Sequence, residues 1–522
     1  MNQFIDSFFR KNKTSFFTFL IFGCVCGAVF RYNMEWWDFI NYHYYNAWAF
    51  LNDRLNVDVV PAFINTFFSP FIELPVYFLT NALNDHPVIF SAIMAIPYGL
   101  LLFAAYKIAT LFFSPDTMEG RRKIEWTMLL CICSPIVFME VSATTHEHSI
   151  SFLVLAALYP LLKGMKEHHL SVKSVLFSGF ILGAAAGLKM TYALYAAATG
   201  VALIFFYKQF DNPLKTILYF TLAGIAGFLV SYGYWGWILW KNFQSPVFPF
   251  FNNIFQSPYW TDVDYKDVRY FGKSWLTVLF YPFYIVFKTG GDYSLHHRFL
   301  ISHLRLIAGM LVFIITFISV AKKRFVHSND NDLLLHFLMF WMVVAYLFWL
   351  WLFRVYRYMI PFELMLSVVL VHFFFKKEKI TLVPLALFLL FICLTGFECV
   401  HLSGSRASDD TLIPKIKNVS LEKNTLILID VVPSSLMIPF LSKDKTMPAA
   451  IAPTHIEDVN GSLFYAVGHF SKKRHNLINE YKKNKNPIVL LTERRKNKAC
   501  VHLITLFQED FYIPYFLCPY VD

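Results

Sequence analysis

The chain has 522 residues, 57% of them hydrophobic and 19% aromatic, and a formal charge of +11. Its mean hydropathy of +0.48 excludes an ordinary soluble domain, because uncharged blocks of about 18 or more residues cross a bilayer as helices. The positive charges concentrate in short loops between apolar blocks, which is typical of membrane orientation and excludes nucleic acid as a partner.

We predict a polytopic all-α membrane protein with eleven transmembrane helices. The first apolar run follows Arg10, Lys11 and Lys13 and has no small-residue cleavage site after it, so we interpret it as a retained anchor. The predicted spans are residues 15–31, 88–113, 126–143, 149–163, 174–188, 191–207, 216–240, 304–321, 332–352, 358–375 and 380–398.

Loop charge orients these spans. With the N-terminus in the cytoplasm, the inside loops are 114–125, 164–173, 208–215, 322–331 and 376–379, and each of them is basic. The apolar run 276–287 is too short to cross, and counting it as a span would place the basic run 322–324 outside. We therefore expect a transmembrane domain over 1–398 with outer loops at 32–87 and 241–303. A separate domain over 399–522 would then lie on the outer side.

The first outer loop contains an aromatic and amide-rich stretch, residues 36–77. Asp38, Asn41, Tyr42, Tyr45 and Asn46 recur there at helical i, i+3, i+4, i+7 and i+8 spacing. A helix would place a carboxylate, two amides and two phenols on one face, which is typical of a sugar-binding surface with an acid that takes a proton. The alternative is an amphipathic helix at the lipid headgroups, with its aromatic side chains as interface anchors.

A very short second outer loop, residues 144–149, contains His146, Glu147 and His148. This alternation predicts either ligands for a divalent cation or a second acid near Asp38. The alternative is a polar loop that caps the next helix.

Three outer positions carry cations that we interpret as phosphate ligands. Lys189 lies where one span ends and the next begins, and its alternative is a snorkelling lysine. Arg354 and Arg357 form an i, i+3 pair that would place two guanidiniums on one helical face, and the alternative is anchoring at the membrane interface. Arg298 follows a Gly-Gly pair in the long loop, where a lid and a solvated turn are both open interpretations.

The tail has a different pattern. Residues 425–430 and 487–493 read as buried strands and 475–483 as a helix, which predicts a small α/β domain. An oxidising outer side would allow Cys500 and Cys518 to form a disulfide.

These features resemble the GT-C class of membrane glycosyltransferases, and more narrowly a largely uncharacterised bacterial group within it. The residues that carry the resemblance are Asp38 in the first outer loop and the stretches NYHYYNAWAFLNDR, FFSPFIELPVYFL, GLKMT, SPVFPFFNNIFQSP and RYMIP. It covers about residues 15–400. Such enzymes use sugars carried on polyprenyl phosphate or diphosphate.

The resemblance implies an inverting sugar transfer at the outer face of a bacterial inner membrane, to a glycan, lipid or protein acceptor. Asp38 would be the general base and Glu147 a second catalytic acid. Lys189, Arg298, Arg354 and Arg357 would stabilise the leaving phosphate, and Asn41, Tyr42 and Tyr45 would contact substrate. Because histidines flank Glu147 where many members have paired carboxylates, the need for a divalent metal stays open.

Two rival functions remain. A polysaccharide polymerase or ligase would centre on residues 288–305 and would not need Asp38. A transporter or lipid flippase would need charged groups in the middle of spans, which are scarce in this sequence.

Overall fold

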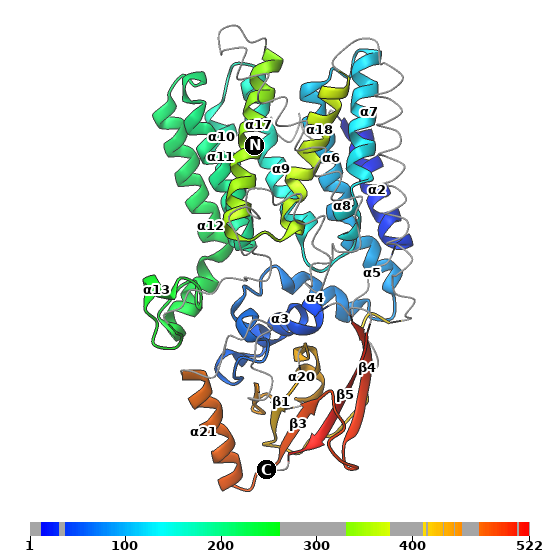
Figure 1. The fold of residues 1–522 in the computed structure, drawn as a ribbon, viewed down its shortest axis with the longest axis vertical. Helices are drawn as coiled ribbons and strands as arrows, with labels where there is room; N and C mark the ends of the chain where they lie inside the picture. Colours follow the sequence, from blue (N-terminus) through cyan, green and yellow to red (C-terminus); the bar gives the residue numbers. More distant parts are fainter. Residues whose placement is uncertain are drawn as a thin grey trace, which may run out of the picture. The chain divides into compact units, whose positions relative to one another are not determined.

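The computed structural model describes residues 12–30, 37–261, 330–375, 411–413, 416–431, 433–442, 444–451, 469–508 and 511–520. The chain is mostly helical and ends in a small sheet (Figure 1). It forms two compact units. The helical unit comprises Met1–Tyr32, Ser91–Tyr232 and Asp267–Arg406, and the mixed unit comprises Asn33–Phe90, Gly233–Lys266 and Ala407–Asp522.

The helical unit is a bundle of apolar helices. Its described helices are α2 (Lys13–Val29), α6 (Ile96–Phe112), α7 (Met118–Ile132), α8 (Pro135–Met139), α9 (Glu147–Lys166), α10 (Val172–Leu188), α11 (Ala193–Phe205), α17 (Asp330–Leu352) and α18 (Ile360–Phe374). Helix α5 (Pro87–Met94) leads into this unit, and α12 (Pro213–Phe243) leads out of it. Within the described residues, five helical stretches are long and apolar enough to cross a membrane.

Exposed apolar side chains show which surfaces face lipid. On α2, Phe17, Ile21, Val25 and Val29 recur every four residues and are all more than half exposed. In α12, only 11% of the most apolar window is buried. Apolar faces of this kind, on helices long enough to cross a bilayer, are typical of a membrane protein.

Helices α10 and α12 pack through glycine. A Cβ atom on Gly183 would lie 1.9 Å from the carbonyl oxygen of Gly224, so the two backbones approach more closely than any larger residue allows. This is the small-residue packing that membrane helices use in place of a hydrophobic driving force.

Most of the predicted spans correspond to helices. The expected span 126–143 is the main exception, because α7 begins earlier, at Met118, and ends at Ile132. Thr117 starts it by accepting a hydrogen bond from the Gly120 amide, so part of the expected loop 114–125 is helical. The expected elements at 276–287, 304–321 and 380–398 lie outside the described residues.

The mixed unit contains a five-stranded sheet with the order β2-β1-β3-β5-β4. Its strands are β1 (Leu426–Ile429), β2 (Ala449–Ile451), β3 (Ile488–Thr492), β4 (Val501–Gln508) and β5 (Phe511–Pro519). Strand β1 pairs in parallel with β2 and β3, and β5 is antiparallel to both β3 and β4. The predicted strands 425–430 and 487–493 are therefore confirmed, whereas β2, β4 and β5 were not predicted.

Other elements of the mixed unit come from the first loop, the long loop and the tail. They include η2 (Phe39–His43), α3 (Tyr44–Leu51), η3 (Arg54–Asn56), η4 (Phe63–Phe67), α4 (Glu73–Ala82), α13 (Asn252–Phe255), η10 (Ser435–Met437), α20 (Ile438–Leu441) and α21 (His469–Lys483). The predicted helix 475–483 is the second half of α21. Cys500 and Cys518 form a disulfide, which confirms the expected pairing.

An aromatic cluster joins three distant segments of this unit. The ring of Phe470 in α21 lies 5.8 Å from Phe67, 6.0 Å from Phe243 and 6.2 Å from Phe248 between ring centroids. The expected domain boundary at 398–399 lies outside the described residues. The described tail, however, belongs to one compact unit with the first loop, Asn33–Phe90, rather than packing alone.

Candidate functional site

Three helix ends in the helical unit bring polar side chains together. Glu147 is the first residue of α9, and Lys189 lies in the extended link between α10 and η5 (Met190–Tyr192). Arg357 lies in η9 (Tyr356–Met359), the 3₁₀ turn between α17 and α18. Each position is a break between helices, where a side chain can leave the lipid-facing surface and turn inward.

These residues form one cluster with Tyr192, called here the Glu147 centre. Oε1 of Glu147 lies 2.5 Å from the Lys189 Nζ and 3.3 Å from the Arg357 Nε. Tyr192 donates its hydroxyl to Oε2 at 2.7 Å, and Lys189 also donates to the Thr145 carbonyl oxygen at 2.7 Å. The Glu147 side chain is fully buried, while those of Lys189 and Arg357 are 20% and 16% exposed. The carboxylate is therefore enclosed, and both cations keep accessible surface.

Burying this carboxylate is tolerable because Lys189 and Tyr192 donate hydrogen bonds to it and Arg357 adds an ion pair. A buried charge is costly unless it is paired and hydrogen-bonded, and charge-assisted bonds are the strongest of these interactions. The N-terminal position of Glu147 on α9 adds the favourable end of the helix dipole. The Tyr358 ring lies 5.4 Å from the Lys189 Nζ and 5.7 Å from the Arg357 Cζ, within cation–π range of both.

A second acid, Glu140, belongs to the same electrostatic environment. Its carboxyl is buried and interacts electrostatically with the charges of Arg357 and Glu147. Its Oε2 accepts a hydrogen bond from the Thr145 hydroxyl. Glu147 is the acid that forms the ion pairs with Lys189 and Arg357.

Neighbouring hydrogen bonds fix the turn that carries Arg357. The Tyr195 hydroxyl donates to the Tyr358 carbonyl oxygen at 2.7 Å. The Tyr356 hydroxyl donates to Oε1 of Glu363, a fully buried acid in the first turn of α18. Arg357 is therefore held between two anchored tyrosines, which limits its orientations.

The structure separates the two arginines that the sequence analysis placed on one helical face. Helix α17 ends at Leu352, and Arg354 follows it with a left-handed backbone (φ 58°). Its Nε donates to the Leu350 carbonyl oxygen at 2.7 Å, while Arg357 faces Glu147. The expected shared helical face is wrong, because α17 ends before Arg354 and Arg357 lies in a separate 3₁₀ turn.

The expected metal ligands in the second loop do not gather around one point in the described part of the helical unit. The Nε2 of His148 lies 2.8 Å from the Val137 carbonyl oxygen, and the His148 ring stacks on Tyr98. Glu147 faces the cations, and His146 is buried with a left-handed backbone (φ 64°). Of the three expected metal ligands, Glu147 is the one that belongs to the Glu147 centre.

In the mixed unit, the aromatic stretch is helical from residue 37 to 51, as predicted, but it contains a π-helical turn, η2. The wider turn breaks the single face expected from regular helical spacing. Tyr45 donates its hydroxyl to Oδ2 of Asp58 at 2.6 Å, and Asn46 donates to the Asn65 carbonyl oxygen at 2.8 Å. One expected substrate contact, Tyr45, and another residue of the expected face, Asn46, therefore hold the loop itself.

For the other expected site residues, a role in the site stays a prediction. Asp38 immediately precedes the π-helical turn and is buried. Asn41 is fully buried, and neither polar atom of its amide has a hydrogen-bond partner among the described residues. Tyr42 is buried next to the His43 ring. Arg298 lies outside the described residues.

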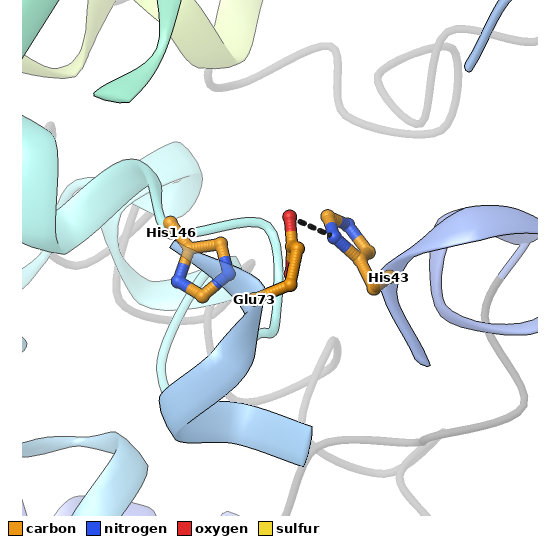
Figure 2. Close-up of side chains that lie close together, drawn as sticks. All are labelled: His43, Glu73 and His146. Atoms are coloured by element: carbon orange, nitrogen blue, oxygen red, sulfur yellow. Dashed lines mark ion pairs between the residues drawn. The ribbon is translucent and has the colours of Figure 1, made fainter. Parts of the chain in front are cut away.

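A buried histidine–carboxylate pair in this unit was not predicted from the sequence. The Nδ1 of His43 lies 2.7 Å from Oε1 of Glu73, and both side chains are buried (Figure 2). His43 closes the π-helical turn that follows Asp38, and Glu73 begins α4. The sequence contains one indication of this pair. Glu73 lies inside the apolar segment 67–79, where a buried carboxylate needs a partner.

No protein-family profile matches the chain, and no match to it is found among curated proteins. In the Glu147 centre two cations converge on one buried carboxylate, and both cations keep accessible surface. Such a site favours an additional anion, and a guanidinium with an ammonium suits the oxygens of a phosphate.

Proposed function

We propose that the protein is a membrane glycosyltransferase that transfers a sugar from a polyprenyl-phosphate carrier to an acceptor hydroxyl on the outer face of a bacterial inner membrane. The supporting observation is the meeting of Lys189 and Arg357 at one buried carboxylate, from helix ends far apart in sequence. Eleven spans, a cytoplasmic N-terminus and an outer tail belong to the same proposal. The Cys500–Cys518 disulfide supports an outer tail because disulfides persist in oxidising compartments.

In the proposed reaction Asp38 takes the proton of the acceptor hydroxyl. The acceptor oxygen forms a bond to the anomeric carbon while the bond from that carbon to the phosphate oxygen breaks. The electron pair leaves with the polyprenyl phosphate, whose growing negative charge Lys189 and Arg357 stabilise. Glu147 sets the positions of both cations through its two carboxylate oxygens, and stabilisation of the leaving group is the largest contribution expected of such a site.

The test is release of polyprenyl phosphate from purified full-length protein incubated with a panel of polyprenyl-phosphate hexoses and pentoses. We expect release with at least one donor, and its loss in Asp38→Asn without loss of folding or membrane insertion. Asp53→Asn is the matched control, because Asp53 is an exposed acid of the same loop. Full activity of Asp38→Asn would eliminate Asp38 as the base, and no release from any donor would contradict the transferase. A transporter or flippase would release none.

A further inference from the structure

The first loop of the mixed unit contains a fully buried ion pair between Arg54 and Asp58. The Arg54 Nη2 lies 2.6 Å from Oδ1 of Asp58, and the Arg54 Nε donates to Oδ2 at 2.9 Å. The two side chains are 0% and 1% exposed. This is a bidentate pair, in which the planar guanidinium and the planar carboxylate fix each other's orientation.

The remaining bonds of this pair go to the tail. Arg54 donates through Nη1 to the Lys445 carbonyl oxygen at 2.6 Å and through Nη2 to that of Met447. The amide of Ala449, the first residue of β2, donates to Oδ1 of Asp58 at 2.9 Å. We call these two side chains, with the backbone of 445–449, the Arg54 clasp. It joins positions almost 400 residues apart in sequence.

Backbone pairing continues the contact beyond the clasp. The Val59 amide donates to the Ala449 carbonyl oxygen at 2.8 Å, and Val59 forms a parallel bridge with Ala450. The first loop therefore extends the sheet beside β2. Nearby, the Ser435 hydroxyl donates to the Pro61 carbonyl oxygen at 2.8 Å. The register between loop and tail is thus specified by side chains and by backbone together.

One bond connects the clasp to the helix that contains Asp38. The Tyr45 hydroxyl donates to Oδ2 of Asp58 at 2.6 Å, and the Tyr45 side chain is almost wholly buried. Tyr45 lies in α3, which continues without interruption from the π-helical turn after Asp38. Seven residues separate the two positions, or roughly 10 Å along a helix. A rotation of the helix at Tyr45 would therefore move Asp38.

Both oxygens of Asp58 are fully occupied by hydrogen bonds, so Asp58 cannot form other bonds if the helix rotates. Each of its oxygens already accepts one bond from Arg54, and the second bond to each comes from Ala449 or Tyr45. A fully satisfied buried network of this kind specifies one arrangement, because any other leaves a buried polar atom unmet. The tail is therefore part of what determines the direction of the helix.

We propose that the C-terminal tail is a scaffold that orients the helix carrying Asp38, and that Tyr45 is the positioning residue through which the Arg54 clasp acts. This inference rests on the proposed function, in which Asp38 is the base. It also replaces the expectation that Tyr45 contacts substrate. A base displaced by a fraction of an ångström keeps its chemistry but loses rate, since proton transfer depends steeply on geometry.

Tyr45→Phe tests this with a loss of one hydroxyl group, which leaves the ring and the ion pair in place. Tyr44→Phe is the matched control, because the Tyr44 hydroxyl donates to Oδ1 of Asn81 within the same loop rather than to the clasp. We expect Tyr45→Phe to lower kcat for polyprenyl phosphate release about tenfold with an unchanged KM for the donor. Tyr44→Phe should stay close to wild type. The assays run well below the melting temperature of both variants.

A second measurement needs no substrate. Amide hydrogen exchange at residues 37–44 should be about fivefold faster in Tyr45→Phe, because one hydrogen bond that restrains the helix is gone. Arg54→Lys should have a similar effect, since an ammonium cannot reproduce the bonds of the guanidinium fork. Exchange in α4 serves as the internal reference in each variant.

The outcomes separate the alternatives. A lower kcat with an unchanged donor KM supports positioning, whereas a purely stabilising role would lower the melting temperature and leave kcat intact. A raised KM with normal kcat would show that Tyr45 touches substrate and would overturn the inference. If wild-type protein releases no polyprenyl phosphate, the proposed function fails. Unchanged exchange at 37–44 would then still reject the scaffold on its own.

Discussion

Arg354 and Arg357 are three residues apart and have different surroundings. Arg357 faces the buried carboxylate of Glu147 and keeps 16% of its side chain exposed, so it can meet an incoming anion. Arg354 is buried at the end of α17 and donates its Nε to a backbone carbonyl oxygen. The difference arises from one left-handed residue, which redirects the chain between the two side chains.

We therefore predict that Arg357→Ala weakens use of the lipid donor and that Arg354→Ala does not. Loss of a charge-assisted contact to the leaving phosphate should lower kcat/KM for the donor about tenfold or more, corresponding to about 1.5–3 kcal/mol. Steady-state release of polyprenyl phosphate over a range of donor concentrations measures it. Equal kcat/KM values for the donor in the two variants, both correctly folded, would remove Arg357 from the phosphate site.

At the scale of whole elements, the sequence predicted helices well and their interruptions poorly. Apolar runs of the right length located α2, α6, α9 and α12, because helix formation in a bilayer depends chiefly on hydropathy and length. The π-helical turn after Asp38 was not predictable, since regular spacing assumes 3.6 residues per turn throughout. The end of α17 at Leu352 agrees with the predicted span 332–352, but the break that follows it, before the 3₁₀ turn of Arg357, was missed.

For the candidate site, individual residues were predictable from the sequence but their arrangement was not. Sequence singled out Glu147, Lys189 and Arg357 individually, because charged residues near the ends of apolar helices need partners. Their convergence on one carboxylate depends on how α9, α10 and α17 pack, which no local pattern contains. The His43–Glu73 pair is similar, since His43 in an aromatic stretch has no signal until α4 is placed.

The packing of α10 against α12 yields a prediction at this scale. Gly183→Ala should destabilise the bundle by about 1–3 kcal/mol, because a methyl group 1.9 Å from a backbone oxygen forces the helices apart. Gly200→Ala is the matched control, since its Cβ would lie 3.6 Å from the Phe220 ring, an ordinary contact. Thermal melting of both variants in one detergent measures the difference. Identical melting temperatures of the two variants would show that α10 and α12 do not pack closely at Gly183.

For the whole molecule, the tail was expected as an independent domain and is instead built together with distant segments. The Arg54 clasp, the Val59–Ala450 bridge and the aromatic cluster around Phe470 each join the tail to chain that precedes it by hundreds of residues. The local sequence pattern predicts β1 and β3 because each is a compact apolar run. It does not indicate which distant segments of the chain complete their core.

The disulfide makes the location of the mixed unit testable. Cys500 and Cys518 join the start of β4 to the end of β5, and such a bond persists only on an oxidising side of the membrane. We expect both thiols to be blocked in protein trapped with maleimide directly from intact cells, in a variant whose other six cysteines are replaced. Prior reduction should expose them together. Replacing either cysteine should free its partner, and two free thiols without reduction would place the tail in the cytoplasm and contradict the proposed topology.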